Sequence, residues 1–175
     1  MQRVLVSRCL LGEAVRYDGA AGGPFDRLLR WQSEGRVVPV CPEVAGGLPV
    51  PRPPAEVLGG QGAGVLDGLV QVVTIDGVDV SDAFRAGAEE ALRLVAEHGI
   101  RVAILKARSP SCGHRETYDG SFSGTRVPGE GVTAAALRRA GVQVFSEEEL
   151  DAAETELQRL ESGRWPDASD GPAIS

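Results

Sequence analysis

The chain has 175 residues, of which 42% are hydrophobic, and this composition is sufficient for one domain with a buried core. The formal net charge at pH 7 is −7, and the excess acid lies at the C-terminal end, where residues 146–175 carry nine acidic and two basic side chains. We interpret this acidic segment as a solvated surface. The rest of the chain is neutral and has no basic stripe, which argues against a nucleic-acid-binding protein.

The first residues do not have the pattern of a secretory signal, because Met1 and Gln2 lead directly into an apolar run without a basic leader. No apolar stretch approaches the roughly 20 residues that a membrane span needs. We therefore expect a cytoplasmic protein with no membrane partner, in a compartment where thiols stay reduced.

Short apolar runs rich in β-branched residues predict the strands. In chain order they occupy residues 4–6, 37–40, 69–75, 102–105 and 142–145. Several of these runs are continuously apolar, which is typical of parallel strands buried on both faces.

Apolar positions at helical spacing predict helices between the strands, over residues 24–34, 81–98 and 133–140. Ser146 and Glu149 form a capping-box pattern that begins one more helix. The alternation of strands and helices predicts a three-layer α/β/α domain with a mostly parallel, Rossmann-like or flavodoxin-like sheet. We expect residues 1–162 to form this single domain and residues 163–175 to form a flexible tail.

The three cysteines each lie in a polar motif near the end of a predicted strand. Cys9 and Cys41 directly follow the first two strands, and Cys112 lies seven residues after Leu105, in the loop that follows a later strand. Ligand sites of parallel α/β sheets lie outside the carboxyl ends of the strands. We therefore expect the three thiols to converge, close enough to share one ion, and an odd count of cysteines argues against a disulfide framework.

The spacing of these cysteines leaves several kinds of site open. Paired CxxC knuckles, the usual pattern of zinc fingers, are absent, and a structural zinc ion would need a fourth ligand, for which His114 is the nearby candidate. Three thiolates on an iron–sulfur cluster would leave one iron open to a substrate. Taken singly, each cysteine is equally well explained as a small buried apolar side chain.

Several polar residues near the cysteines are candidates for chemistry. Glu43 is placed to act as a general acid or base, and Ser109 and Ser111 to donate a proton or bind a substrate. Arg52 lies on a proline-rich loop and Lys106 ends a strand, so both are candidates for substrate binding. The alternatives are ordinary ones, namely a surface carboxylate, turn serines and solvated basic side chains.

A tripeptide that occurs twice in the chain adds Tyr17 to the candidates for substrate binding. Tyr17-Asp18-Gly19 follows Cys9, and Tyr118-Asp119-Gly120 follows Cys112. Two matches of three residues do not establish an internal repeat.

Several ordered motifs between residues 3 and 150 match those of one known family. They are Ser7-Arg8-Cys9-Leu10-Leu11-Gly12, Arg16-Tyr17-Asp18-Gly19, Val40-Cys41-Pro42-Glu43-Val44, Gly46-Gly47-Leu48-Pro49, Pro51-Arg52-Pro53-Pro54-Ala55-Glu56, Ile104-Leu105-Lys106, Ser109-Pro110-Ser111-Cys112-Gly113, Tyr118-Asp119-Gly120 and Gly129-Glu130-Gly131-Val132-Thr133-Ala134. In these motifs the chain resembles the bacterial thiouracil desulfidase family, formerly called domain of unknown function 523.

The resemblance implies an α/β domain that holds a [4Fe–4S] cluster through Cys9, Cys41 and Cys112. It implies a non-redox desulfidation of a thiolated pyrimidine such as 2-thiouracil, in which thiocarbonyl becomes carbonyl and sulfide is released. The residues that match the family's proposed proton-transfer groups are Glu43 and Ser109. The implied partner is therefore a small thiolated nucleobase.

Three other functions remain open at this point. One is another cluster-dependent lyase, such as a dehydratase, which would need arginines for substrate carboxylates; Arg8, Arg16, Arg52 and Arg108 lie near the motifs. The others are a non-catalytic cluster carrier and a zinc-binding protein.

Overall fold

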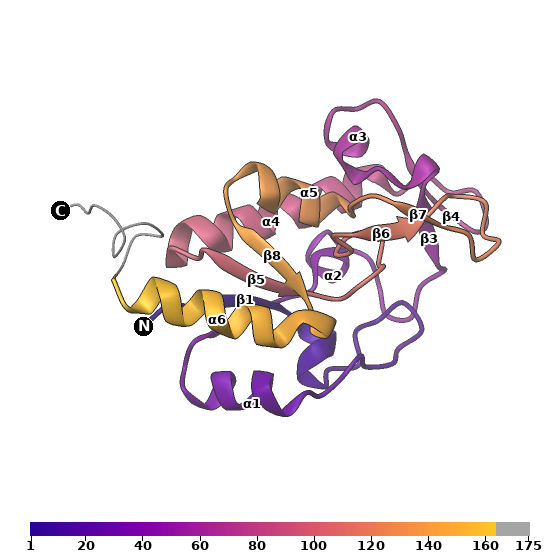
Figure 1. Cartoon of the computed structure of the whole chain (residues 1–175). Coiled ribbons are helices and arrows are strands. Elements are labelled where there is room, and N and C mark those ends of the chain that lie inside the picture. The colour runs from indigo at the N-terminus through magenta and orange to yellow at the C-terminus, as the bar shows by residue number, and fades with distance from the viewer. Residues whose placement is uncertain (164–175) are drawn as a thin grey trace.

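A four-stranded parallel sheet forms the centre of the protein, in the order β2-β1-β5-β8 (Figure 1). The computed structural model describes residues 1–163, so the predicted tail lies outside the described residues from position 164 onward. The strands are β1 (Val4–Ser7), β2 (Val37–Val40), β5 (Val102–Leu105) and β8 (Gln143–Ser146). Counted along the chain, the parallel strands lie in the order 2-1-3-4, which is the flavodoxin-like arrangement.

Helices cover both faces of this sheet, as expected. They are α1 (Asp26–Ser33) and α6 (Leu150–Glu161) on one face, and α4 (Ser81–His98) and α5 (Val132–Arg139) on the other (Figure 1). Side chains alternate along β1, so that Val4 and Val6 pack in the cluster that includes Trp31 of α1, and Leu5 packs in the opposite cluster. Both faces of the strand are therefore buried, which confirms the predicted three-layer fold.

Smaller elements lie beyond the carboxyl ends of the parallel strands (Figure 1). Two antiparallel pairs join β3 (Ala55–Val57) with β4 (Val72–Thr74), and β6 (Glu116–Tyr118) with β7 (Arg126–Pro128). The short helices are η1 (Arg8–Leu11), α2 (Pro42–Ala45), η2 (Leu58–Gly60), α3 (Gly62–Leu66) and η3 (Glu147–Glu149).

The strand predicted over residues 69–75 differs from the observed one. Only Val72–Thr74 form a strand, and it pairs with β3 outside the parallel sheet. The side chain of Leu69 is 80% exposed, whereas Val72 is fully buried. The apolar run therefore supplies a half-buried strand instead of one covered on both faces.

The predicted helix boundaries agree closely with the structure. Helix α4 spans the predicted residues and ends at Gly99, whose φ of 63° places it in the left-handed region that terminates helices. The capping box is present, since Ser146 and Glu149 bond reciprocally at the start of η3. Among the described residues, no helix is long and apolar enough to cross a membrane.

The acidic C-terminal segment also forms ion pairs over its described residues, 146–163. Asp151 of α6 pairs with Arg27 at 2.7 Å, Glu154 with Arg30 at 2.7 Å and Glu161 with Arg36 at 2.9 Å. The acids of this segment thus contact basic side chains from the first quarter of the chain.

Candidate active site

Three strand ends bring the cysteines to one edge of the sheet. Cys9 lies in η1 directly after β1, Cys41 is the residue before α2 and follows β2, and Cys112 lies in the connection from β5 to β6. Because β1 lies between β2 and β5, the three carboxyl ends are adjacent. The connection that follows β1 contains α1, and the connection that leads to β5 contains α4, so the two cover opposite faces of the sheet. Open α/β sheets bind ligands where such connections separate, which here is between β1 and β5.

A pocket of about 510 Å³ opens at this edge. Its walls contain all the residues that the sequence put forward for a cluster-dependent desulfidase: Cys9, Tyr17, Cys41, Glu43, Arg52, Lys106, Ser109, Ser111 and Cys112. The volume lies in the range of small-molecule sites. The three thiols therefore face one shared cavity.

The structure does not show the three thiols grouped around one ion, so the expectation that they could share a single ion stays a prediction. Within residues 1–163, no three histidine, cysteine or acidic side chains are grouped to hold a metal ion. The cysteines are free of disulfides, with Cys9 and Cys112 buried and Cys41 half-buried. Each comes from a different strand end, and all three line the same pocket.

Burial dominates the electrostatics of two of these thiols. It raises the pKa of the Cys9 thiol to about 11, against the opposing effect of the Lys106 ammonium. It raises the pKa of the Cys112 thiol to about 12, although hydroxyls of Ser7 and Ser111 act in the opposite direction. Both thiols are therefore protonated at neutral pH without a metal, and binding to iron would release their protons.

The Cys112 sulfur receives two hydroxyl contacts that orient it. Ser7 Oγ and Ser111 Oγ each lie 3.5 Å from Cys112 Sγ. Ser7 also accepts the Lys106 amide proton at 3.0 Å, so it joins the end of β1 to the loop after β5. Sequence reasoning did not select Ser7, and the available signal was its position just before the Arg8-Cys9 motif.

Glu43 is held from two sides inside the pocket. Its Oε1 accepts a hydrogen bond from Arg52 Nε at 2.9 Å, and its Oε2 accepts one from Ser111 Oγ at 2.9 Å. The other Arg52 nitrogens donate to the carbonyls of Pro49 at 3.0 Å and Val15 at 3.2 Å. The guanidinium is thus bonded to the protein itself through three of its nitrogens.

The two serines continue this network toward the cysteine loop. Ser111 Oγ lies 3.4 Å from Ser109 Oγ, and Ser109 Oγ accepts the Cys112 amide proton at 2.7 Å. A continuous chain of hydroxyls therefore connects the Glu43 carboxylate to Ser109. The two residues expected to transfer protons are joined through Ser111.

The N-terminus of α5 holds the cysteine loop in place. The Val132 amide donates to the Pro110 carbonyl at 2.9 Å, and the Thr133 amide donates to the Ser111 carbonyl at 2.8 Å. A side chain at Gly131 would lie 2.5 Å from the Ser111 carbonyl carbon, so only glycine fits there. This contact explains why the glycine-rich motif at residues 129–134 accompanies the cysteine motif.

Lys106 and Tyr17 lie near the pocket edge. Lys106 Nζ pairs with Glu147 at 3.1 Å. The aliphatic part of the Lys106 side chain runs beside Gly22, and a Cβ added at that glycine would also lie 3.4 Å from Cys9 Sγ. The Tyr17 side chain is 41% exposed, and its carbonyl accepts the Arg52 amide proton at 2.7 Å. Tyr118, from the second copy of the Tyr-Asp-Gly tripeptide, lines the same pocket.

The alternative functions gain little from this geometry. His114 bonds Glu149 at 2.5 Å and lies in a neighbouring pocket, away from the cysteines, which does not support the zinc site. The arginines that a dehydratase would need are mostly engaged by the protein's own acids. These pairs are Arg8 with Glu13, Arg52 with Glu43 and Arg108 with Glu148.

The donor set suits an iron–sulfur cluster. Thiolates are the ligands that such clusters use, and three thiols free of disulfides line this one cavity. The hydroxyl contacts to Cys112 are of the kind that orient cluster ligands.

Comparisons with known proteins agree with the geometry. The family model described as 2-thiouracil desulfurase matches residues 4–149. A solved structure of the [4Fe-4S]-dependent thiouracil desulfidase TudS is 48% identical, with a TM-score of 0.82, and the match covers 90% of this chain and 99% of that one. The uncharacterized protein YbbK of Bacillus subtilis (strain 168) is 43% identical over 148 residues, which are 85% of this chain and 97% of YbbK. The chain belongs to the 2-thiouracil desulfurase family.

Proposed function

We propose that the protein is a [4Fe–4S]-dependent enzyme that hydrolytically removes sulfur from a thiolated pyrimidine such as 2-thiouracil. The observation that carries this proposal is the hydroxyl chain from Glu43 through Ser111 to Ser109, which lies in the same pocket as the three thiols. The similarity to TudS, a [4Fe-4S]-dependent thiouracil desulfidase, supports both the cofactor and the substrate.

Cys9, Cys41 and Cys112 are the residues that would hold the cluster. When bound, the cluster supplies an iron without a protein ligand, which acts as a Lewis acid toward the substrate sulfur. The net reaction exchanges a C=S bond for a C=O bond, consuming water and releasing hydrogen sulfide. No electrons are gained or lost, so the reaction needs no external reductant.

The side chains of the pocket account for the protons. The Glu43 carboxylate accepts a proton from the water that attacks the thiocarbonyl carbon. Ser111 passes a proton along the hydroxyl chain, and Ser109 delivers it toward the ring nitrogen. In this scheme Ser111 connects the two proton-transfer groups, a role that differs from the simple substrate contact expected from the sequence.

Arg52 acts through Glu43. Its bonds to Glu43, Pro49 and Val15 fix the guanidinium and therefore the carboxylate beside it. We assign Arg52 a positioning role, while Lys106 and Tyr17 remain candidates for contact with the base. A free nucleobase fits a pocket of this size, and we propose that the reaction takes place in the cytoplasm.

Anaerobic reconstitution with iron and sulfide tests this proposal. The reconstituted protein is expected to contain about four irons, to be brown, and to convert 2-thiouracil to uracil with one sulfide released per turnover. The Cys9→Ala, Cys41→Ala and Cys112→Ala variants are each expected to lose colour and activity. A colourless wild-type protein with full activity would contradict the proposal, as would activity that survives in all three variants.

A further inference from the structure

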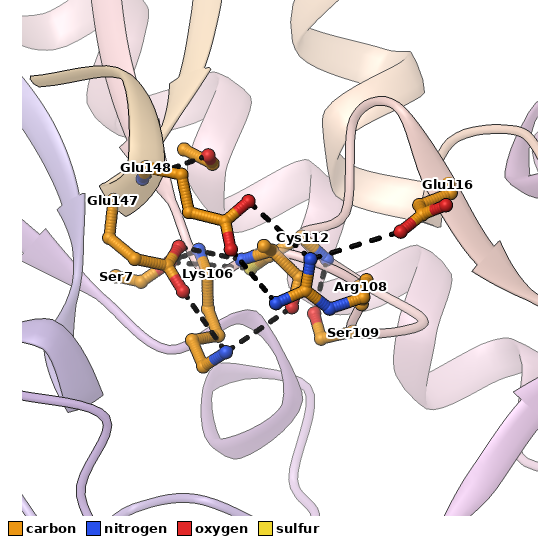
Figure 2. A network of polar contacts seen from close by, with 10 residues as sticks. Ser7, Lys106, Arg108, Ser109, Cys112, Glu116, Glu147 and Glu148 are labelled. Atoms are coloured by element: carbon orange, nitrogen blue, oxygen red, sulfur yellow. Dashed lines mark hydrogen bonds and ion pairs between the residues drawn. The ribbon is translucent and has the colours of Figure 1, made fainter. Parts of the chain in front are cut away.

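The loop formed by residues 106–115 connects β5 to β6 and carries Cys112 and both candidate serines. The α5 N-terminus anchors it on one side. On another side it meets three consecutive carboxylates, Glu147, Glu148 and Glu149, which we call the clasp. Figure 2 shows the first two of them beside the loop. Each carboxylate contacts a different point of the loop.

Glu147 contacts the start of the loop through both of its oxygens. Its Oε1 accepts the Ala107 amide proton at 2.8 Å, and its Oε2 pairs with Lys106 Nζ at 3.1 Å. The Lys106 amide in turn bonds Ser7, whose hydroxyl contacts Cys112 Sγ. The first two loop residues are therefore held between the clasp and a serine that contacts the cysteine sulfur.

Glu148 and Glu149 contact the loop further along. Glu148 pairs with Arg108 at 3.1 Å, and Glu149 bonds His114 at 2.5 Å. Arg108 has a φ of 67°, in the left-handed region, which is unfavourable for a residue other than glycine. The chain reverses at this strained residue on its way to Ser109, and its guanidinium points toward Glu148 and Glu116 (Figure 2).

The position of the clasp follows from the sheet. Strands β5 and β8 are parallel neighbours, with Leu105 paired to Ser146, so the chain leaves both strands at the same height. The Glu147 side chain is only 9% exposed, unlike most surface ion pairs. A nearly buried carboxylate bonded to a backbone amide and an ammonium holds its partners more firmly than an exposed pair does.

We propose that Glu147 is a positioning residue of the active site, which fixes the loop and so places Ser109 and Cys112 relative to Cys9 and Glu43. This inference rests on the proposed function, because it assigns Glu147 a part in holding the cluster and the proton-transfer chain. Glu147 touches none of the reacting groups and acts through Ala107 and Lys106. The C-terminal helix segment thereby becomes part of the site.

The test compares Glu147→Ala, Glu147→Gln and the control Glu154→Ala in the full-length, cluster-loaded protein. Glu154 is an ion-paired acid of α6 that contacts Arg27 and Arg30 but not the loop. We expect Glu147→Ala to lose its cluster to a chelator about tenfold faster than wild type, to exchange amide hydrogens of residues 106–115 faster, and to lower kcat with little change in KM. Glu147→Gln keeps an acceptor for the Ala107 amide and should show a smaller effect in the same direction.

Unchanged cluster loss and unchanged exchange in Glu147→Ala would overturn the inference, and so would an equal effect of Glu154→Ala. If Glu147→Ala does not fold, Glu147→Gln decides, because a wild-type rate of cluster loss in that variant would exclude the role. Hydrogen exchange of the loop is independent of substrate. If the wild-type protein binds no cluster or releases no sulfide, the proposed function fails, while the exchange measurement still decides whether Glu147 fixes the loop.

Discussion

Arg52 and Glu43 form an ion pair with a distance of 2.9 Å between Nε and Oε1, in which only 5% of the arginine side chain and 12% of the glutamate side chain are exposed. The pair joins the proline-rich loop after α2 to the residue that begins the proton-transfer chain. Removing one partner of a buried pair lowers the free energy of unfolding, since the remaining charge is left without a partner.

Replacement of Arg52 by lysine should therefore lower kcat by at least tenfold, because an ammonium cannot bond Glu43, Pro49 and Val15 in the same planar arrangement. Arg52→Gln should also lower the free energy of unfolding by about 3 kcal/mol, measured by denaturant titration. Arg93→Lys, in an exposed pair on α4, serves as the control and should match wild type. Equal kcat values for Arg52→Lys and wild type would exclude the positioning role.

Ser111→Ala should interrupt the hydroxyl chain between Glu43 and Ser109. We expect kcat to fall about 100-fold, the scale of general acid–base catalysis, while iron content stays at the wild-type level. Ser111→Thr, which keeps a hydroxyl, should recover part of the rate. The exposed Ser33, whose hydroxyl bonds the Arg30 carbonyl, offers Ser33→Ala as a control. Loss of iron in Ser111→Ala would instead point to a structural role.

Ser7→Ala should make the cluster harder to reduce. Its hydroxyl lies 3.5 Å from Cys112 Sγ, and loss of a hydrogen bond to a ligating sulfur leaves more negative charge on that thiolate. The reduction potential, measured by an EPR-monitored titration, is expected to become more negative. The Lys106 amide also loses its acceptor, so the variant should unfold about 1–3 kcal/mol more easily. A potential equal to that of wild type would contradict the prediction.

Glu149 should make the stability of the fold sensitive to acid. Burial opposes its ionisation, but hydrogen bonds from Arg115, the Ser146 amide and His114 prevail and lower the pKa of Glu149 from its usual 4.5 to about 2. Because the pKa of Glu149 is lower in the folded state than in the unfolded state, its ionisation stabilises the folded state above pH 4.5. This contribution disappears as the pH falls from about 4.5 toward 2. Solvent screens a partly exposed group, so the full size of this contribution is about 1–3 kcal/mol.

The measurement is the free energy of unfolding against pH for wild type and Glu149→Gln. Wild type should be more stable at pH 7 and should lose more stability between pH 4.5 and pH 2. Glu89→Gln, which removes an exposed carboxylate of α4, should follow the wild-type curve. Parallel curves for wild type and Glu149→Gln would contradict the prediction.

Prediction from sequence worked best where one local pattern decides the outcome. Helix α4 has a continuous apolar face and a terminal glycine, and its predicted limits match the structure. Prediction failed for residues 69–75, because an apolar run does not reveal whether one face or both will be covered. It did not predict the ion pairs of the acidic C-terminal segment, whose partners are far away in sequence.

The sequence by itself determined the α/β class, the strand-end positions of the three cysteines and the family motifs around them, because each of these depends on residues close together in the chain. Only the tertiary structure decided that the thiols line one pocket, that Arg52 bonds Glu43, and that Glu147 holds the cysteine loop. Those contacts join residues brought together by strand order and register. Spacing along the chain carries no information about such distances.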